Sequence, residues 1–310
     1  MSGRLRIGFL STLYHTSHLI RQDSLIEKKL GVQSLWRLYG TGPAMVEAFR
    51  RQEIDLAFIG LPPAMIGIST GVPLVCIGGG HVEGTLIVGG PSFRSLEESR
   101  SLGDFLVQFQ GLKVGIPSRG SIHDVIFRHL LERQQVAGVK IVNYSWADLI
   151  LHGLRKKEVD AAVGTPPLAV LCEKEFGMRV LAGPQGLWPF NPSYGIVATR
   201  RALEDEASEI LEGFLEVHEE CCNLLRECPG EAARTVSLAL PGVEEAFVLR
   251  TLEVSPRYCA SLPGSYVRSC LEFGPVLARM GYMERLPAES EIFDLRLISK
   301  VHPGAHHYGE

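Results

Sequence analysis

The sequence carries one phrase twice, as FRRQEIDLAFIGLPPAMI at residues 49–66 and LRKKEVDAAVGTPPLAVL at residues 154–171. Each copy runs from cations through glutamate, a β-branched residue and aspartate into a short apolar run, a glycine and two prolines. The aspartates are Asp55 and Asp160, and the second copy is one residue shorter before its glycine. A nearly continuous apolar run is typical of a parallel strand covered on both faces. The phrase therefore predicts the same buried strand in two similar α/β lobes.

The segments around the two copies extend the repeat. RLRIGFL (4–10) and LKVGIPSRGS (112–121) each lead from an apolar strand through a polar loop into a helical stretch. By its apolar periodicity, the first unit predicts strands at 4–10, 32–39, 54–60, 72–80 and 84–90 and helices at 17–30 and 44–52. The second unit predicts strands at 112–117, 139–143, 159–164 and 178–184 and helices at 121–135 and 145–157. We expect a loop at each Pro-Pro pair.

This order of elements predicts two Rossmann-like lobes joined by a hinge. We expect lobe one to comprise residues 1–90 and 195–310, and lobe two residues 91–194, because a polar connector (91–110) leaves the first unit and a strand, GIVAT (195–199), returns to it. Residues from 201 onward are mostly helical and are expected to pack on lobe one, ending in a frayed tail, HPGAHHYGE. Two crossings between lobes make a hinge, which is the architecture of ligand-driven closure.

Composition narrows the class of protein. With 310 residues, 45% hydrophobic and 21% charged, the chain can bury the core of a globular protein of two ordinary domains. The net charge of -4 and the absence of a basic stripe argue against nucleic-acid binding. The apolar stretch Ile7–Leu10 predicts a buried strand rather than a signal peptide, so a cytoplasmic location or a trimmed leader both stay open. Seven cysteines without framework spacing slightly favour a reducing compartment.

The duplicated motifs resemble those of a known family. They are Arg6-Ile7-Gly8, Gly40-Thr41-Gly42, Glu53-Ile54-Asp55-Leu56-Ala57 and Pro62-Pro63 in lobe one, and Lys113-Val114-Gly115, Gly120-Ser121 and Glu158-Val159-Asp160-Ala161-Ala162 in lobe two. With them the chain resembles the type II periplasmic binding proteins, the solute receptors of ABC importers, and within these the NMT1/THI5-like branch for sulfonates, nitrate and thiamine precursors. The resemblance covers residues 4–200 and, more loosely, the helical C-terminal third.

The resemblance implies a ligand clamped between the lobes without chemistry. It implies a small, anionic or heteroaromatic metabolite, an ABC permease as partner, and a location in the periplasm or at the cell surface. Relatives that make menaquinone or thiamine precursors use the same cleft, so a cytoplasmic enzyme is one alternative. A cytoplasmic ligand sensor is another. The sequence shows no Walker loop, HExxH, GxSxG, CxxC or GxGxxG motif, and we therefore favour a binding protein over an enzyme.

Candidate ligand contacts lie in the loops that follow the predicted strands, because ligands of open α/β sheets bind at the carboxyl ends of strands and face helix N-termini. In lobe one they are Ser11, Thr12, Tyr14, His15, Thr41, Gly42, Gly60, Leu61 and His81. In lobe two they are Ser118, Arg119, Gly120, Ser121, Tyr144 and Thr165, and the second crossing adds Trp188 and Phe190.

Arg119 is the strongest single candidate among them. It precedes Gly120-Ser121 at the start of a predicted helix, where a guanidinium, hydroxyls and free backbone N–H groups suit a carboxylate, sulfonate or phosphate. A solvated arginine beside an ordinary helix cap is the alternative. Trp188 and Phe190 could stack on a planar ligand or pack in the hinge. His81 could donate to a ligand and change charge near neutral pH, or be a plain loop residue.

We expect no cofactor, no metal site and no catalytic residue, and we expect a monomer. Asp55 and Asp160 lie at strand starts away from the cleft, so their repetition predicts a structural role. Cys221-Cys222 falls in a helical run, where the two side chains cannot share a face. Three histidines of the tail could bind a metal only incidentally: His302, His306 and His307.

Overall fold

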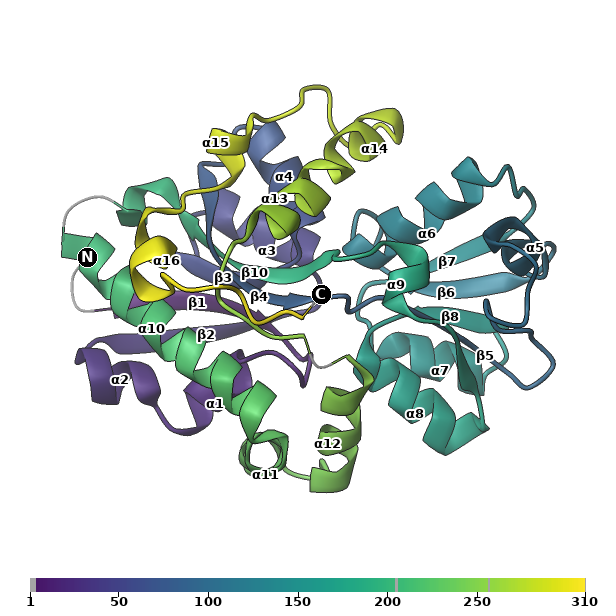
Figure 1. Ribbon diagram of the computed structural model, residues 1–310, viewed down its shortest axis with the longest axis horizontal. Helices are drawn as coiled ribbons and strands as arrows, with labels where there is room; N and C mark the ends of the chain where they lie inside the picture. Colours follow the sequence, from purple (N-terminus) through teal and green to yellow (C-terminus); the bar gives the residue numbers. More distant parts are fainter. Residues whose placement is uncertain (1–3, 204–205, 256, 310) are drawn as a thin grey trace.

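The computed structural model describes residues 4–203, 206–255 and 257–309 and has two lobes, each built on a five-stranded sheet (Figure 1). The first sheet has the order β2-β1-β3-β10-β4 and the second the order β7-β6-β8-β5-β9. The strands of the first sheet are β1 (Arg4–Leu10), β2 (Gln33–Tyr39), β3 (Leu56–Ile59), β4 (Leu74–Val82) and β10 (Pro192–Thr199). Those of the second are β5 (Leu86–Gly89), β6 (Lys113–Pro117), β7 (Lys140–Tyr144), β8 (Ala161–Gly164) and β9 (Arg179–Ala182).

The two sheets repeat one another strand for strand. β1 and β6 each lie between two parallel neighbours, and the fourth strand of each sheet, β10 or β5, is antiparallel to β3 or β8. Both antiparallel strands directly follow a crossing between the lobes, at residues 83–85 and 188–191. The strand expected at 84–90 therefore exists as β5 but pairs in the second sheet, not in the first, because the chain crosses as soon as β4 ends.

The repeated aspartates hold the same backbone position in both lobes. The Asp55 N–H donates to the Arg6 carbonyl (2.8 Å), and the Asp55 carboxylate accepts from the Arg6 N–H (3.1 Å). The Asp160 N–H donates to the Lys113 carbonyl (2.8 Å), and its carboxylate accepts from the Lys113 N–H (2.8 Å). Each aspartate thus joins the starts of two neighbouring parallel strands, which is the structural role that its repetition predicts.

The Pro-Pro pairs begin helices rather than loops. Pro62-Pro63 lies in the first turn of α4 (Leu61–Ser69), and Pro166-Pro167 opens α8 (Pro166–Phe176). The first turn of a helix has N–H groups without intrahelical acceptors, so a residue that lacks an N–H loses nothing there, and its fixed φ suits the helix. The prediction of a loop was wrong because proline was considered only as a residue that ends helices.

The other helices of the two lobes follow the sequence closely. The segment expected as one helix at 17–30 divides into α1 (Ser17–Gln22) and α2 (Leu25–Leu30), since Ser24 between them has a left-handed φ of 50°. Then come α3 (Gly42–Arg50), α5 (Leu102–Val107), α6 (Ile122–Arg133), α7 (Leu149–Arg155), α9 (Pro184–Leu187) and the 3₁₀ turn η1 (Arg200–Leu203).

The C-terminal third is helical and touches both lobes. Its helices are α10 (Glu206–Glu227), α11 (Pro229–Ala239), α12 (Glu245–Val254), α13 (Gly264–Leu271), α14 (Phe273–Arg279), α15 (Glu289–Ile292) and α16 (Arg296–Val301). α10 and α16 pack on lobe one, whereas α12 also contacts α8 and α14 also contacts α6 of lobe two (Figure 1). The expected frayed tail is packed instead: Tyr308 is buried, and its hydroxyl accepts from the Gly80 N–H (3.1 Å).

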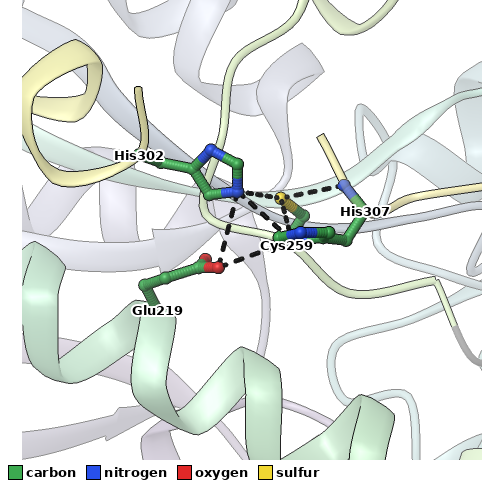
Figure 2. A group of neighbouring side chains, drawn as sticks. All are labelled: Glu219, Cys259, His302 and His307. Atoms are coloured by element: carbon green, nitrogen blue, oxygen red, sulfur yellow. Dashed lines mark hydrogen bonds and ion pairs between the residues drawn. The ribbon is translucent and has the colours of Figure 1, made fainter. Parts of the chain in front are cut away.

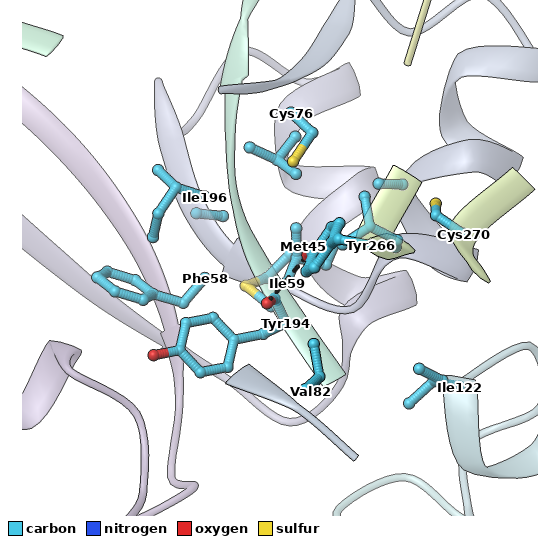
Figure 3. Close-up of a cluster of buried hydrophobic side chains, with 14 of the residues drawn as sticks. Met45, Phe58, Ile59, Cys76, Val82, Ile122, Tyr194, Ile196, Tyr266 and Cys270 are labelled. Atoms are coloured by element: carbon cyan, nitrogen blue, oxygen red, sulfur yellow. Dashed lines mark hydrogen bonds between the residues drawn. The ribbon is translucent and has the colours of Figure 1, made fainter. Parts of the chain in front are cut away.

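A hydrophobic core joins the first sheet to the C-terminal helices (Figure 3). Phe58, Tyr194 and Ile196 lie on adjacent strands and point to one face of this sheet, where Phe58 contacts Phe214 of α10. Tyr266 of α13 packs on the opposite face, against Gly195. The Tyr266 hydroxyl is buried and donates to the Tyr194 carbonyl (3.2 Å), so this polar group is satisfied inside the core. Within the described residues, no helix is both long and apolar enough to span a bilayer.

Candidate functional site

The loops at the carboxyl ends of the parallel strands face each other across the two lobes. The Ser11 hydroxyl donates to the Asp148 carboxylate of lobe two (2.9 Å). A Cβ on Gly40 would lie 2.8 Å from both the Ser145 carbonyl oxygen and the Trp146 ring, so only glycine fits there. The loops that sequence reasoning assigned to a cleft therefore do meet between the lobes, and the lobes are closed upon each other at this rim.

Four helix N-termini open onto these loops. They belong to α3, α4, α6 and α8, whose N-cap residues are Thr41, Gly60, Ser121 and Thr165. A Cβ on Gly60 would lie 3.8 Å from the Ile122 side chain, so the starts of α4 and α6 are opposed. Helix N-termini carry unpaired N–H groups and a partial positive charge. The arrangement can therefore stabilise an anion held between the lobes.

The hydroxyl groups at these N-termini differ in what they bind. The Ser121 hydroxyl accepts from the Asp124 N–H (3.3 Å) and caps α6. The Thr41 and Thr165 side chains, 8% and 9% exposed, make no capping hydrogen bond within the described part of the chain. The buried Ser118 hydroxyl also has no partner among the described residues. Three hydroxyls at the interlobe loops are thus left for another acceptor or donor.

Asp124 fixes the Ser118–Ser121 loop and was not singled out from the sequence. Its fully buried carboxylate accepts from the Gly120 N–H (3.0 Å), the Arg128 guanidinium (2.8 Å), the Asn143 amide (3.0 Å) and the Tyr282 hydroxyl (2.9 Å). Gly120 has a φ of +79°, which glycine adopts without strain. The position three residues after an N-cap serine is the signal that could have identified Asp124.

Arg119 lies at the rim of the interlobe site rather than inside it. Its side chain is exposed, its Nε donates to the Tyr282 hydroxyl (3.3 Å), and its guanidinium carbon is 5.6 Å from the centre of the Tyr282 ring. The hydrogen bond to Tyr282 raises the pKa of Arg119 further above its usual range. Arg119 thus joins lobe two to the C-terminal segment. Its guanidinium stays positively charged beside the Ser118–Ser121 loop that Asp124 fixes.

The lobe-one loop places Tyr14 and His15 at the base of the site, beside the hinge. The Tyr14 hydroxyl is 3.0 Å from the Ser193 hydroxyl, and the His15 ring is 4.0 Å from that of Tyr194. The His81 ring is 4.8 Å from the rings of both Tyr14 and Tyr258. Ser193 and Tyr258 were not predicted as part of this cluster, because nothing in the sequence indicates that they meet a loop far away in the chain.

Burial sets the protonation of this cluster. It lowers the pKa of His81 to about 4 and that of His15 well below its usual value, and it raises the pKa of Tyr14. Both histidines are therefore neutral near pH 7. His81 Nε2 lies 2.7 Å from the Ser255 carbonyl, and the Nδ1 atoms of both rings have no partner among the described residues. These rings can each offer or accept one further hydrogen bond.

The hinge is built from strained backbone and a buried ion pair. Glu83 in the first crossing and Phe190 in the second both have a left-handed φ, 65° and 59°. The Glu83 N–H donates to the Asn191 carbonyl (2.8 Å), and its carboxylate accepts from the Phe190 N–H (2.8 Å) and pairs with Arg257 (3.2 Å). Such backbone costs about 1–3 kcal/mol per residue and persists where the surroundings over-determine it.

The remaining predicted contacts are placed elsewhere or engaged already. Trp188 stacks on Phe273 with ring centres 4.0 Å apart and donates to the Ser269 hydroxyl (3.2 Å), which is packing within the hinge. The Phe190 ring contacts the C-terminal tail, Leu61 is wholly buried in the core, and the Tyr144 hydroxyl packs over Gly153 of its own lobe. Thr12 and Gly42 stay in the interlobe loops, in the turn after β1 and at the start of α3.

A pocket of about 770 Å³ opens next to the hinge, away from the opposed loops. The end of β9 and the 95–98 turn line one side of it, and Glu83, Ser255 and Arg257 line the other. None of the predicted ligand contacts lines this pocket. We assign the candidate site to the interlobe loops instead, because these carry the converging helix N-termini and the unused hydroxyls.

Comparison with known proteins agrees with this geometry. The solved structure of the alkanesulfonate-binding protein SsuA from Xanthomonas axonopodis pv. citri, bound to MOPS, superposes with a TM-score of 0.76 at 17% identity and covers 94% of this chain and 98% of its own. The aliphatic sulphonate-binding protein SsuA from Escherichia coli gives 0.76 and 17%, over 94% and 97%. The nitrate-binding protein NrtA from Synechocystis PCC 6803 gives 0.76 and 12%, over 97% and 88%.

These likenesses confirm the two-lobed fold of the periplasmic binding proteins that the repeat predicted. The comparison with curated proteins found no match. A sequence model described as the NMT1-like family matches residues 2–240, which is more than three quarters of the 310 residues. The chain therefore belongs to the NMT1-like family.

Proposed function

We propose that this protein is the substrate-binding component of an ABC-type importer and that it clamps a small anion between its lobes. The observation that carries the proposal is that two helices of each lobe begin just after a parallel strand of their sheet, with the starts of α4 and α6 opposed across the lobes. Unpaired N–H groups at helix starts bind anions without a formal cation. The structural neighbours named above are described as binding sulfonate and nitrate, and both ligands are anions.

Closure supplies the mechanism of binding. The ligand docks on the N-termini of one lobe, and rotation at the hinge brings the other pair onto it. The ligand shifts the equilibrium toward closure only by the extra contacts that it makes with the closed form. In the closed form the Ser11–Asp148 hydrogen bond joins the lobes. A permease that recognises the closed form is the partner that this mechanism implies, and it places the protein in the periplasm or at the cell surface.

Thr41 and Thr165 give the sharpest test, because their hydroxyls make no capping bond whose loss would confuse the result. We expect Thr41→Val and Thr165→Val each to weaken binding by about 5- to 10-fold, the scale of one hydrogen bond to a charged group. Binding is measured by calorimetry with nitrate, short alkanesulfonates and, as an uncharged comparison, a thiamine pyrimidine precursor. Thr235→Val in α11 is the matched control, because this threonine lies away from the interlobe loops and makes no side-chain hydrogen bond among the described residues.

Two results would contradict the proposal. The first is tight binding of the pyrimidine with no binding of any anion in the series. The second is an anion affinity that neither threonine variant changes. Mass spectrometry of the small molecules released from freshly purified protein identifies the natural ligand independently of the chosen series.

Catalysis in the same cleft is the second candidate function. The observation that favours it is the buried group of Tyr14, His15 and His81, whose pKa values are displaced and whose ring nitrogens Nδ1 have no described partner. Displaced pKa values gather at acid–base sites, and burial is the largest cause of the shift in each of these three residues. Incubation of the protein with its released ligand separates the two functions, because a binding protein returns the ligand unchanged.

A further inference from the structure

Four side chains with metal-binding atoms converge beside α10 and α16 (Figure 2). They are Glu219 in the middle of α10, Cys259 in the loop before α13, His302 at the end of α16, and His307 in the tail. One ligand atom from each lies within 4.8 Å of all the others. The cluster shares no residue with the interlobe site.

Five of the six separations within the cluster are close to the edges of a tetrahedron around zinc, and the sixth, between the Glu219 and Cys259 ligand atoms, is at most 4.8 Å. His302 Nε2 is 3.2 Å from His307 Nδ1 and 3.5 Å from the Cys259 sulfur, and the sulfur is 3.8 Å from His307 Nδ1. The Glu219 Oε1 atom is 3.6 Å from His302 and 3.7 Å from His307. Zinc bonds of about 2.0–2.3 Å in tetrahedral geometry put neighbouring ligand atoms about 3.3–3.6 Å apart.

The chemistry of the four groups also suits a divalent cation. A thiolate and a carboxylate supply two negative charges, and two neutral imidazoles complete a mixed sulfur, nitrogen and oxygen set of the kind that zinc prefers. Two negative charges neutralise a dication, so the site is compatible with its burial. Cys259 is 0% exposed and Glu219 9% exposed, whereas the His307 side chain is 46% exposed and leaves a route for the ion.

Neighbouring backbone groups hold the ligands in place. The Ala260 N–H donates to the second carboxylate oxygen of Glu219 (2.8 Å), and the His307 N–H donates to the Cys259 sulfur (3.4 Å). Next to His307, the Tyr308 hydroxyl lies 3.1 Å from the Ser261 carbonyl and from the Gly80 nitrogen. The ligand residues are thus preorganised rather than gathered from a flexible tail, and such outer contacts tune metal affinity.

We propose that Glu219, Cys259, His302 and His307 form a closed, tetrahedral Zn²⁺ site that fastens the C-terminal tail to α10 and to the loop before α13. Four protein ligands leave no open position, which is the pattern of a structural rather than a catalytic zinc. The ion joins three segments that are far apart in sequence. Without the ion, the Tyr308 contacts alone hold the tail on β4.

The test uses the full chain produced without a polyhistidine tag. We expect close to one zinc per chain by elemental mass spectrometry, and full recovery of that value after stripping with a chelator and adding back zinc. Co²⁺ in place of zinc should give the visible bands of tetrahedral coordination and a sulfur-to-metal charge-transfer band. Zinc should also raise the midpoint of thermal unfolding, because it binds the folded chain preferentially.

His307→Ala is the mildest ligand variant, since this side chain is the most exposed of the four. We expect it to weaken zinc binding at least about 100-fold, because changes to outer contacts alone cost 10- to 100-fold. Cys259→Ser should abolish the charge-transfer band. His306→Ala is the matched control, as the His306 ring packs near Phe190 and Tyr308 instead.

Three results would overturn the proposal. One is a zinc content far below one per chain both before and after reconstitution. Another is unchanged zinc affinity in His307→Ala, a variant expected to fold because the His307 side chain is largely exposed. The third is an equal loss of affinity in His306→Ala and His307→Ala, which would assign the binding to tail histidines in general.

Discussion

The two copies of the repeat share a skeleton, including a helix start at the interlobe loops, and differ in the first loop of each lobe. Asp55 and Asp160 bond the same backbone positions, and α4 and α8 both begin at their Pro-Pro pairs. The first loop of lobe one, however, buries an aromatic and histidine cluster, whereas that of lobe two is a short turn fixed by Asp124 and flanked by Arg119. The repeat therefore supplies the strands and helix starts of both lobes, whereas the side chains beside those helix starts differ between the copies.

We expect the largest difference between the two lobes in their stability at acidic pH. In lobe one, burial lowers the pKa of His18, His81 and His218 to about 4 and that of His15 well below its usual value. In lobe two, burial lowers the pKa of His123 to about 4. An unfolded histidine titrates near 6.5, so the unfolded chain binds more protons between about pH 6.5 and 4. Stability is then full above that window and decreases as the pH falls through it, by up to about 1.4 kcal/mol per pH unit for each histidine.

Hydrogen exchange at pH 7 and pH 5, corrected for intrinsic rates, measures this difference. We expect peptides from β1, β4 and α10 to lose protection at pH 5 before those from β6 and β8. Equal loss in both sheets, or earlier loss in the second, would show that the buried histidines of lobe one do not control its acid stability.

Asp55 and Asp160 should contribute differently to the free energy of unfolding, although they occupy the same position in the two lobes. The Asp55 carboxylate also pairs with the Arg6 guanidinium (2.6 Å), while Asp160 has only the backbone bond of Lys113 among its described contacts. We expect Asp55→Ala to lower the free energy of unfolding by about 3 kcal/mol and Asp160→Ala by about 1 kcal/mol, given about 1–3 kcal/mol for a hydrogen bond to a charged group.

Urea denaturation of both variants checks this order. Because the Arg6 side chain is 41% exposed, part of the difference should disappear in high salt. If Asp160→Ala proves the more damaging change, the shared backbone bond outweighs the added ion pair, and the two copies are less alike energetically than their geometry indicates.

Arg119 provides a test of how lobe two contributes to ligand binding. Lobe two places a cation at the rim, and we propose that it strengthens the hold on an anion in the closed form. Arg119→Ala should weaken anion binding by about 10-fold, with a loss that decreases as salt is added. Arg133→Ala, at the C-terminal end of the helix α6 that follows the Arg119 loop, is the control. Unchanged affinity in Arg119→Ala would leave this arginine a structural contact of Tyr282 alone.

The fold could be predicted because its signals are local and doubled. Apolar runs and helix caps located most strands and helices, and the family and fold that they suggested are confirmed. What failed was what depends on tertiary contact. β5 was given to the wrong sheet, since an apolar strand does not name its partner, and the tail was expected to fray, since His302 and Tyr308 meet residues far away in sequence.

The ligand contacts stay predictions of uneven quality for the same reason. Loops at strand ends were found, because topology alone puts them between the lobes. Which side chains stay available there could not be predicted: Trp188 is engaged with Phe273, and Leu61 points into the core. The Ser121–Asp124 spacing could have indicated Asp124, but neither its contact with Tyr282 nor the Glu219–Cys259–His302–His307 cluster is encoded by any spacing in the sequence.

The place of β10 between β3 and β4 has a consequence for synthesis of the protein on the ribosome. Every strand of the second sheet falls within residues 86–182, so that sheet can form as soon as its own segment has emerged. The first sheet waits for Pro192–Thr199, and until then the apolar β3 and β4 have no strand between them. The N-terminal strands are thus made first and finished last, and their exposed edges are where a nascent chain would be most open to chaperones or to aggregation.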